Sequence, residues 1–184
     1  MGSNRSARIA ASVIGAIFLL VGGAANPRDQ SPAAPGVTEP LDPATLKEIK
    51  TLYRKLIDAE NRHDLAEVRT MVWDSPSTLF VAKTATSAEG NWAGFWGIDM
   101  VMQHFAEIYD AGTFRIDPDY EKEKVVGLTR DVAETYVPVR ITVAYAGQTP
   151  VPKPFLMILN WIHTTEGWRM ASDIALPIPM PPDS

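Results

Sequence analysis

The sequence contains no cysteine. Disulfide bonds, thiolate metal sites, a cysteine nucleophile and cysteine-linked lipids are therefore excluded. Positive charge is also scarce: there are 17 lysines and arginines against 22 aspartates and glutamates, no basic run occurs, and the formal net charge is -5. A nucleic-acid partner would require clustered positive charge to displace the counterions of the phosphate backbone. The composition therefore disfavours binding to nucleic acid.

The familiar motifs of metal sites and of nucleophilic catalysis are missing as well. The three histidines, His63, His104 and His163, do not show the spacing of metal ligands, so no metal site is predicted. The sequence has neither a serine nucleophile elbow nor a glycine loop that could cradle phosphate. We therefore expect no cofactor. What the chain does have is a composition of 46% hydrophobic and 21% charged residues, which is enough for a sizeable core.

The first 25 residues have the layout of a secretory signal peptide. Arg5 and Arg8 precede an apolar run over Ile9–Val21, and small residues follow at Gly22–Ala25. The apolar run is shorter than the roughly 20 residues of a membrane-spanning helix. We expect cleavage after Ala25 and export to the periplasm or the medium. The alternative is an uncleaved anchor, which would be the protein's contact with a membrane.

Residues 26–42 are rich in proline and nearly free of large apolar side chains, so they are predicted to form an extended linker. One domain should then occupy residues 43–184. Its first helix begins where Asp42 can act as the cap and Pro43 can take the first helical position. This helix should end within residues 60–63. The apolar stripe that predicts it consists of Leu46, Ile49, Leu52, Tyr53, Leu56 and Ile57.

Two further helices and several strands are expected. Asp64 and Glu67 have capping-box spacing and open a short second helix, and an apolar stripe over residues 98–109 predicts a third. Residues 78–83 should form a strand, and from Thr113 onward the apolar period changes to two. Residues 153–178 should form a hairpin that turns at Thr165–Gly167. This order predicts an α+β fold, with helices on one face of a strongly curved antiparallel sheet.

Several segments carry a family resemblance: "AENRHDLAEV" at the end of the first helix, the Gly-Trp-rich segment, "HFAEIYD" and the closing "TTEGWRMASD". With these segments, the chain resembles the nuclear transport factor 2-like superfamily, in particular its SnoaL-like (polyketide cyclase-like) branch. The resemblance implies a cone-shaped, cystatin-like fold with three N-terminal helices packed on the concave face of the sheet. It also implies an interior that holds a small apolar or aromatic molecule, and a homodimer formed through the outer sheet face.

The resemblance to SnoaL-like cyclases implies that one acid on the last strand shuttles a proton. Asp173 matches this position, with His163 or Arg140 as an assisting group. The alternative is that Asp173 is a solvated strand-end residue or pairs with Arg169. The acid of the Arg-x-Asp pair in limonene-epoxide hydrolases is replaced here by Thr142, so that activity is not expected.

The positions that carry the base, the tyrosine and the second acid in ketosteroid isomerases fall on Phe80, Leu56 and Leu159. All three are apolar, so that mechanism is not expected either.

Glu60 stands out independently of any resemblance, because it continues the apolar stripe of the first helix through Tyr53 and Leu56. A carboxyl that is buried there would have a raised pKa and could act as a general acid. One turn from the helix end, it could instead reach water. His163 is similarly ambiguous, since it lies on a mostly apolar strand face. It is either a core histidine or the polar group at a pocket mouth.

Four aromatic residues, Trp73, Trp92, Phe95 and Trp96, cluster between the second and third helices in a segment predicted to be a glycine-rich loop. This loop either covers an apolar pocket as a lid or plugs the interior. The side chains expected to line a pocket are Tyr53, Trp73, Trp92, Trp96, Arg140 and Trp161.

The sequence thus favours an exported domain that binds a small molecule. The first alternative is a lyase, isomerase or cyclase that uses Asp173, with Glu60 or His163 assisting. The second is a structural or protein-interaction module whose interior is filled by its own side chains.

Overall fold

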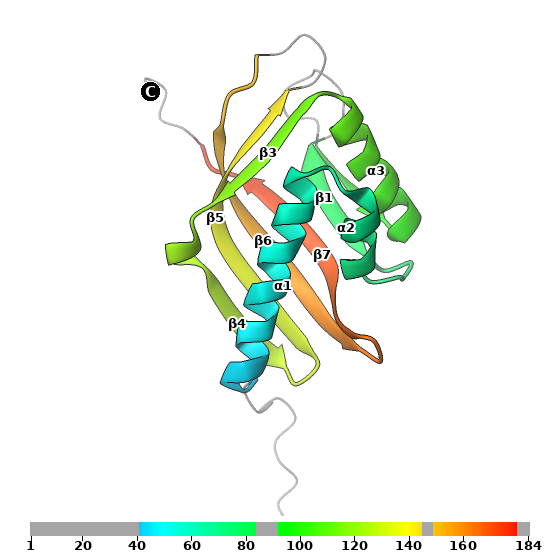
Figure 1. Cartoon of the computed structure of the whole chain (residues 1–184), viewed down its shortest axis with the longest axis vertical. Helices are drawn as coiled ribbons and strands as arrows, with labels where there is room; N and C mark the ends of the chain where they lie inside the picture. Colours follow the sequence, from blue (N-terminus) through cyan, green and yellow to red (C-terminus); the bar gives the residue numbers. More distant parts are fainter. Residues whose placement is uncertain (1–40, 84–91, 145–148, 180–184) are drawn as a thin grey trace, which may run out of the picture. The chain divides into compact units, whose positions relative to one another are not determined.

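The structure, a computed structural model, describes residues 41–83, 92–144 and 149–179 (Figure 1). The predicted signal peptide and nearly all of the predicted linker lie outside the described residues. None of the described helices is long and apolar enough to cross a membrane. The elements in chain order are α1 (Pro43–Asn61), α2 (Leu65–Met71), β1 (Leu79–Lys83), β2 (Trp92–Trp96), α3 (Ile98–Asp110), β3 (Thr113–Pro118), the short 3-10 helix η1 (Tyr120–Lys122), β4 (Lys124–Thr129), β5 (Val132–Ala144), β6 (Lys153–Thr164) and β7 (Gly167–Pro177).

The helix starts follow from local side-chain chemistry. The Asp42 carboxylate accepts hydrogen bonds from the backbone N–H groups of Ala44 and Thr45, at 2.8 and 3.1 Å. The helix α1 begins at the proline that directly follows Asp42. Asp64 accepts from the N–H of Glu67 at 2.9 Å and begins α2 in the same way. Both acceptors satisfy N–H groups that have no partner within the helix. The predicted starts of these two helices are therefore confirmed.

The seven strands form one curved open sheet in the order β2-β1-β7-β6-β5-β3, and β4 pairs with β5 beyond that path. The fold is α+β, as expected, but the sheet is mixed rather than wholly antiparallel, because β1 runs parallel to β7. The prediction assumed hairpin pairing between neighbours in sequence. Instead the first strand pairs with the last, and parallel neighbours cannot be joined by a tight turn.

Only α1 and α2 precede the strands, whereas α3 follows β2. In Figure 1, α1 crosses the sheet diagonally, and it contacts β3, β4 and β5. The third helix contacts β1, β2 and β3. The two helices therefore cover different parts of the sheet, and their buried side chains meet those of the strands in one apolar core.

The described part of the aromatic segment, Trp92–Trp96, is a strand and not a loop. All five residues pair with β1, from Trp92 opposite Lys83 to Trp96 opposite Leu79. Aromatic side chains favour extended backbone, and this preference outweighs the glycine at position 94. Residues 84–91, where the chain passes from β1 to β2, lie outside the described residues.

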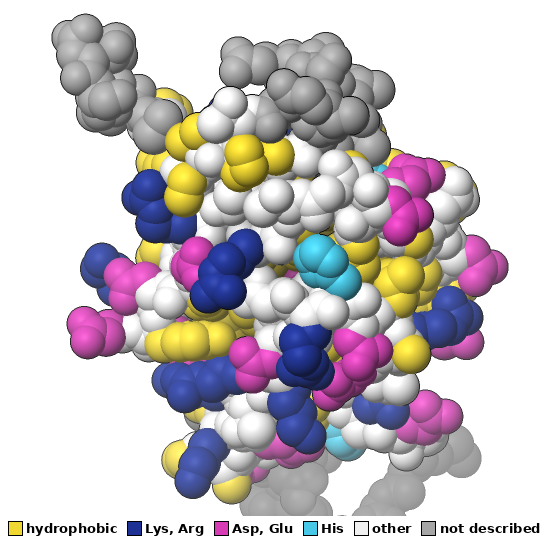
Figure 2. Space-filling model, turned by 45° about the horizontal axis from the view of Figure 1, so that its top comes forward, with side chains coloured by type: hydrophobic (Ala, Val, Ile, Leu, Met, Phe, Trp, Pro, Cys, Tyr) yellow, Lys and Arg dark blue, Asp and Glu magenta, His cyan; other side chains and the backbone are white. Residues whose placement is uncertain are grey.

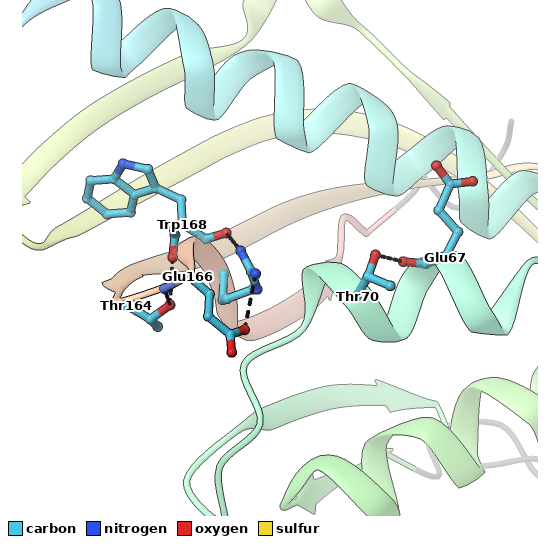
Figure 3. A network of polar contacts seen from close by, with 7 residues as sticks. Glu67, Thr70, Thr164, Glu166 and Trp168 are labelled. Carbon is cyan, nitrogen blue, oxygen red and sulfur yellow. Dashed lines mark hydrogen bonds and ion pairs between the residues drawn. The ribbon is translucent and has the colours of Figure 1, made fainter.

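The predicted turn at the end of the β6–β7 hairpin is confirmed. The Thr164 hydroxyl donates to the carbonyl of Gly167 at 2.8 Å and accepts from the N–H of Glu166 at 3.1 Å (Figure 3). The Arg169 guanidinium also donates to the Glu166 carboxylate, at 3.4 Å. These contacts hold the two arms of the hairpin in register at their closed end. Arg169 therefore pairs with Glu166 rather than with Asp173.

The face of the domain shown in Figure 2 has acidic and basic side chains interspersed, with hydrophobic side chains gathered in groups between them. No continuous positive surface is visible on that face. The large hydrophobic side chains that are exposed in the described residues are Trp96, Met100, Val126, Leu128, Val151, Leu176 and Ile178.

Candidate functional site

A cavity lies between α1, α3 and the sheet. Its volume is about 50 Å³, and about 480 Å³ is free of protein atoms when the part that opens to solvent is included. Its apolar lining residues are Phe80, Ala82, Trp92, Ile108, Phe114, Ile116, Ile141, Val143, Phe155, Met157 and Ala175. The ionisable ones are Glu60, Lys83 and Asp173. Lys83, Trp92, Phe114 and Val143 are half-buried, so the opening is on their side and the other lining residues form the closed part.

Asp173 faces this cavity because of a bulge in β7. Asn160 of β6 pairs with Ser172, but the next residue, Trp161, pairs with Met170, so Ala171 is an extra residue. An extra residue shifts the alternation of a strand by one position. Before the bulge the buried side chains lie at even positions, Trp168 and Met170. After it they lie at odd positions, Asp173 and Ala175.

Asp173 is then enclosed from both sides. In the sheet it lies between Phe80 of β1, with which it pairs in parallel, and Leu159 of β6. Its exposed fraction is 1%. The alternative of a solvated strand-end carboxylate does not describe this environment.

Glu60 reaches the same cavity from the last turn of α1, and its exposed fraction is 0%. The neighbouring Asn61 explains why this helix end does not turn toward water. Its side-chain amide donates to the carbonyl of Ile116 at 2.8 Å, and its side-chain oxygen accepts from the N–H of the same residue at 2.7 Å. This double contact holds the end of α1 against β3.

The two carboxyl groups perturb each other. None of their four oxygens has a hydrogen-bond partner among the described residues. Burial raises the pKa of Asp173 to about 7. Burial, and then the negative charge of Asp173, raise the pKa of Glu60 well above its usual range. An apolar cavity opposes the charged form of a carboxyl, and a second carboxylate opposes it further. Near pH 7 the pair therefore retains at least one proton.

Two tyrosines complete the polar group. The hydroxyls of Tyr53 in α1 and Tyr109 in α3 are buried and lack hydrogen-bond partners among the described residues. Burial raises the pKa of both phenols, and the charges of Asp173 and Glu60 raise it further. Both tyrosines therefore stay protonated near the carboxyls. His63 stacks on the Tyr109 ring, with ring centres 4.6 Å apart, and supports it from the solvent side.

Comparison with solved structures identifies this architecture. The chain is similar to a candidate dehydratase of the nuclear transport factor 2-like family from Streptomyces avermitilis, at a TM-score of 0.62 and 14% identity over 74% of this chain and 99% of that one. It is also similar to a nuclear transport factor 2-like superfamily protein from Salmonella enterica, at a TM-score of 0.60 and 13% identity over 77% and 96% of the two chains. A protein with a cystatin-like fold from Caulobacter vibrioides gives a TM-score of 0.61 and 12% identity over 76% and 92%.

The chain has the nuclear transport factor 2-like, cystatin-like fold. No protein-family model matches the sequence, and no curated protein sequence is similar to it. At 12 to 14% identity the three structures establish the fold alone. The chemistry of the site has to be argued from its own residues.

Within this nuclear transport factor 2-like domain, the structure brings together some of the residues that the sequence singled out. Glu60, Asp173 and Trp92 line the cavity, and Tyr53 lies close enough to sense the charge of both carboxyls. Tyr109 was visible in the sequence only as part of an apolar helix stripe. The signal that would have found it is its place one turn after Phe105 on the buried face of α3.

The other predicted tryptophans lie elsewhere. Trp96 is 61% exposed, and Trp161 is fully buried in the core, where its indole N–H donates to the Thr135 hydroxyl at 2.7 Å. Trp73 lines a separate, more polar surface hollow that includes Arg69. The tryptophans predicted to line a pocket therefore divide between the cavity, the core and the surface.

The two basic residues proposed as assistants of Asp173 are also outside the cavity. Arg140 is exposed and donates to the carbonyl of Pro152 at 3.0 Å. His163 is exposed at the end of β6, with its ring centre 5.0 Å from that of Trp168. In residues 41–83, 92–144 and 149–179, no three His, Asp or Glu side chains come together in a way that could hold a metal ion.

Proposed function

We propose that this domain binds a small apolar or aromatic molecule in the cavity and catalyses proton transfer on it, with Asp173 as the general base and Glu60 as the general acid. The observation that carries the proposal is the pair of fully buried carboxyls, unpartnered among the described residues, in an otherwise apolar cavity. Buried acid groups without partners cost folding free energy. Such a cost is typical of sites that are built for a ligand.

The two groups are suited to opposite roles. A general acid or base works best when its pKa is near the working pH, and the pKa of Asp173 is raised to about 7. Burial raises the pKa of Glu60, and the negative charge of an ionised Asp173 raises it further, so ionisation of Asp173 makes Glu60 hold its proton more firmly. Environments that separate the pKa values of two carboxyls assign one as acid and the other as base.

The reaction class is isomerisation or elimination. Asp173 takes a proton from a carbon of the substrate, and the electron pair of that C–H bond forms a new double bond. In an isomerisation the neighbouring double bond shifts by one position, and its far carbon takes up the proton that Asp173 returns. In an elimination the C–O bond to a neighbouring hydroxyl breaks, and Glu60 protonates the departing oxygen, so that water leaves. The similarity in fold to a candidate dehydratase is compatible with this class.

The proposal includes the setting of the domain. The curved sheet and its helices would form a cone with the helices on its concave face, and the half-buried outward residues Leu156, Ile158 and Ile174 would form part of a homodimer interface. The N-terminal segment would direct the chain out of the cytoplasm. A domain with a filled interior is disfavoured, because the cavity retains free space beside two carboxyls.

The first experiment is native mass spectrometry of the protein produced with export. A small molecule retained in the cavity would be released by denaturation and identified. That molecule is then incubated in D₂O with the protein, and exchange of its acidic C–H is followed by NMR. At a saturating concentration of the molecule, Asp173→Asn should abolish exchange, whereas the exposed control Asp99→Asn should exchange at the wild-type rate. Equal exchange by Asp173→Asn would exclude it as the base.

A further inference from the structure

The polar end of the cavity consists of the carboxyl groups of Glu60 and Asp173, whose oxygens can accept hydrogen bonds from a ligand. None of the four carboxyl oxygens of Glu60 and Asp173 has a hydrogen-bond partner among the described residues. None of the ion pairs in the described residues involves either group. A carboxylate pair inside a protein is normally matched by a cation or a metal. Among the described residues no ion pair supplies this match, so a positively charged ligand would complement the pair.

The wall beside the carboxyls suits a positive charge as well. Of the cavity's lining residues, Phe80, Trp92, Phe114 and Phe155 are aromatic. The rings of Trp92 and Phe155 are tilted toward each other, with centres 6.0 Å apart. The faces of aromatic rings attract cations, and tryptophan does so most strongly. They also pack well against an aromatic or aliphatic body.

We propose that the ligand is a protonated amine on a small aromatic or aliphatic body, with its ammonium group on Glu60 and Asp173 and its body against the aromatic wall. The inference rests on the proposed function, whose site it shares. An ammonium group carries several N–H donors and no acceptor, so it complements oxygens that lack donors. A neutral alcohol supplies one donor, and a carboxylate ligand would be repelled. Since Asp173 has two oxygens, one can accept from the ammonium while the other faces the carbon that loses its proton.

Binding of a cation should release protons, because a nearby positive charge favours the ionised form of a carboxyl. The titratable groups that face the pair are Tyr53 from α1, Tyr109 from α3 and Lys83 from β1. The raised pKa values of both tyrosines keep them neutral below pH 9. The proton released on binding will therefore come from the carboxyl pair, in which Asp173 is the proposed base and Glu60 keeps its proton, and affinity for an amine should rise between pH 5.5 and pH 8.

The test compares 2-phenylethylamine with its neutral isostere 2-phenylethanol by isothermal titration at both pH values. We expect the amine to bind at least about tenfold more tightly than the alcohol at pH 8, and this preference to shrink at pH 5.5. In Asp173→Asn the preference should be lost, with Glu60→Gln as a second variant should the first not fold by circular dichroism. Asp99→Asn should keep the preference.

Equal binding of the amine and the alcohol, or binding of neither, would overturn the amine assignment. The proposed proton transfer has a separate readout, the exchange of the molecule that copurifies. Exchange that depends on Asp173 in a molecule without an amine would leave the proposed function standing while refuting the inference. Amine-selective binding without any exchange would support the inference and refute the proposed proton transfer.

Discussion

Replacement of Asp173 by Asn should weaken the loss of stability that this protein shows as pH rises. The carboxyl group and the amide have nearly the same shape, so Asp173→Asn removes the titration and keeps the packing. In the folded protein the pKa of Asp173 is raised from the ordinary 3.8 to about 7 by burial. Between those values the folded chain holds a proton that the unfolded chain has lost. The free energy of unfolding therefore falls as pH rises.

The size of the effect follows from that shift. A difference of about three pKa units, at about 1.36 kcal/mol each, corresponds to about 4 kcal/mol once both states are ionised. More than half of this should be lost between pH 5 and pH 8. The raised pKa of Glu60 acts in the same direction. The pKa of His104, lowered by burial, acts in the opposite direction below pH 6.5, because the folded state keeps that ring neutral.

The assay is urea denaturation of wild type and Asp173→Asn at half-unit steps from pH 5 to pH 8, followed by tryptophan fluorescence. His104 is present in both proteins, so the difference between the two curves reports Asp173 together with the part of the Glu60 pKa shift that the charge of Asp173 causes. An asparagine without a partner has its own cost, but that cost does not depend on pH. The slope, and not the absolute stability, is therefore the measured quantity.

The reasoning predicts that Asp173→Asn becomes more stable relative to wild type as pH rises. Parallel curves for the two proteins would refute it, because they would mean that Asp173 titrates alike in the folded and unfolded states. That result would also remove the basis for Asp173 as a base with a pKa near neutrality. A matched pair, wild type and Asp99→Asn, should give parallel curves, since Asp99 is exposed.

Three further predictions concern single side chains. Trp161→Phe should destabilise the protein by about 2 kcal/mol in urea denaturation, because it leaves the buried Thr135 hydroxyl without its donor; adding Thr135→Val should recover part of the loss. Asp64→Ala should cost about 1 kcal/mol in the same assay through loss of the α2 cap, and an unchanged midpoint would contradict the assigned role. Trp92→Ala should weaken binding of 2-phenylethylamine severalfold in titration calorimetry, whereas the same change at the exposed Trp96 should not.

Some of the site could be predicted from the sequence, and the residues show why. Glu60 was identified because it continues an apolar helix stripe, and the structure places it in the cavity. Asp173 came from a family resemblance and lines the same cavity. His163 fits an apolar strand face by its spacing, yet it lies past the end of the core and is exposed. Periodicity reports which way a side chain faces but not how far the neighbouring layer extends.

For Trp92–Trp96 the sequence does not determine the secondary structure. Its glycine and aromatic residues are compatible with a loop or with a strand, and the choice depends on a partner to pair with. That partner is β1. Strand formation is decided by side-chain packing and ladder bonds to another segment, so a short stretch of sequence does not determine it.

The sequence by itself determined the features that depend on residues a few positions apart. Asp42 and Asp64 start two helices, Thr164 shapes the last turn, and the alternation of apolar residues marks the strands. Each of these rests on local hydrogen bonds or on the period of one element. The tertiary structure decided the site. The parallel pairing of β1 with β7 brings Phe80 beside Asp173, and an extra residue in β7 turns that carboxyl inward. The reason is physical: strand register and burial depend on segments that are distant in sequence, and they meet only when the sheet is assembled.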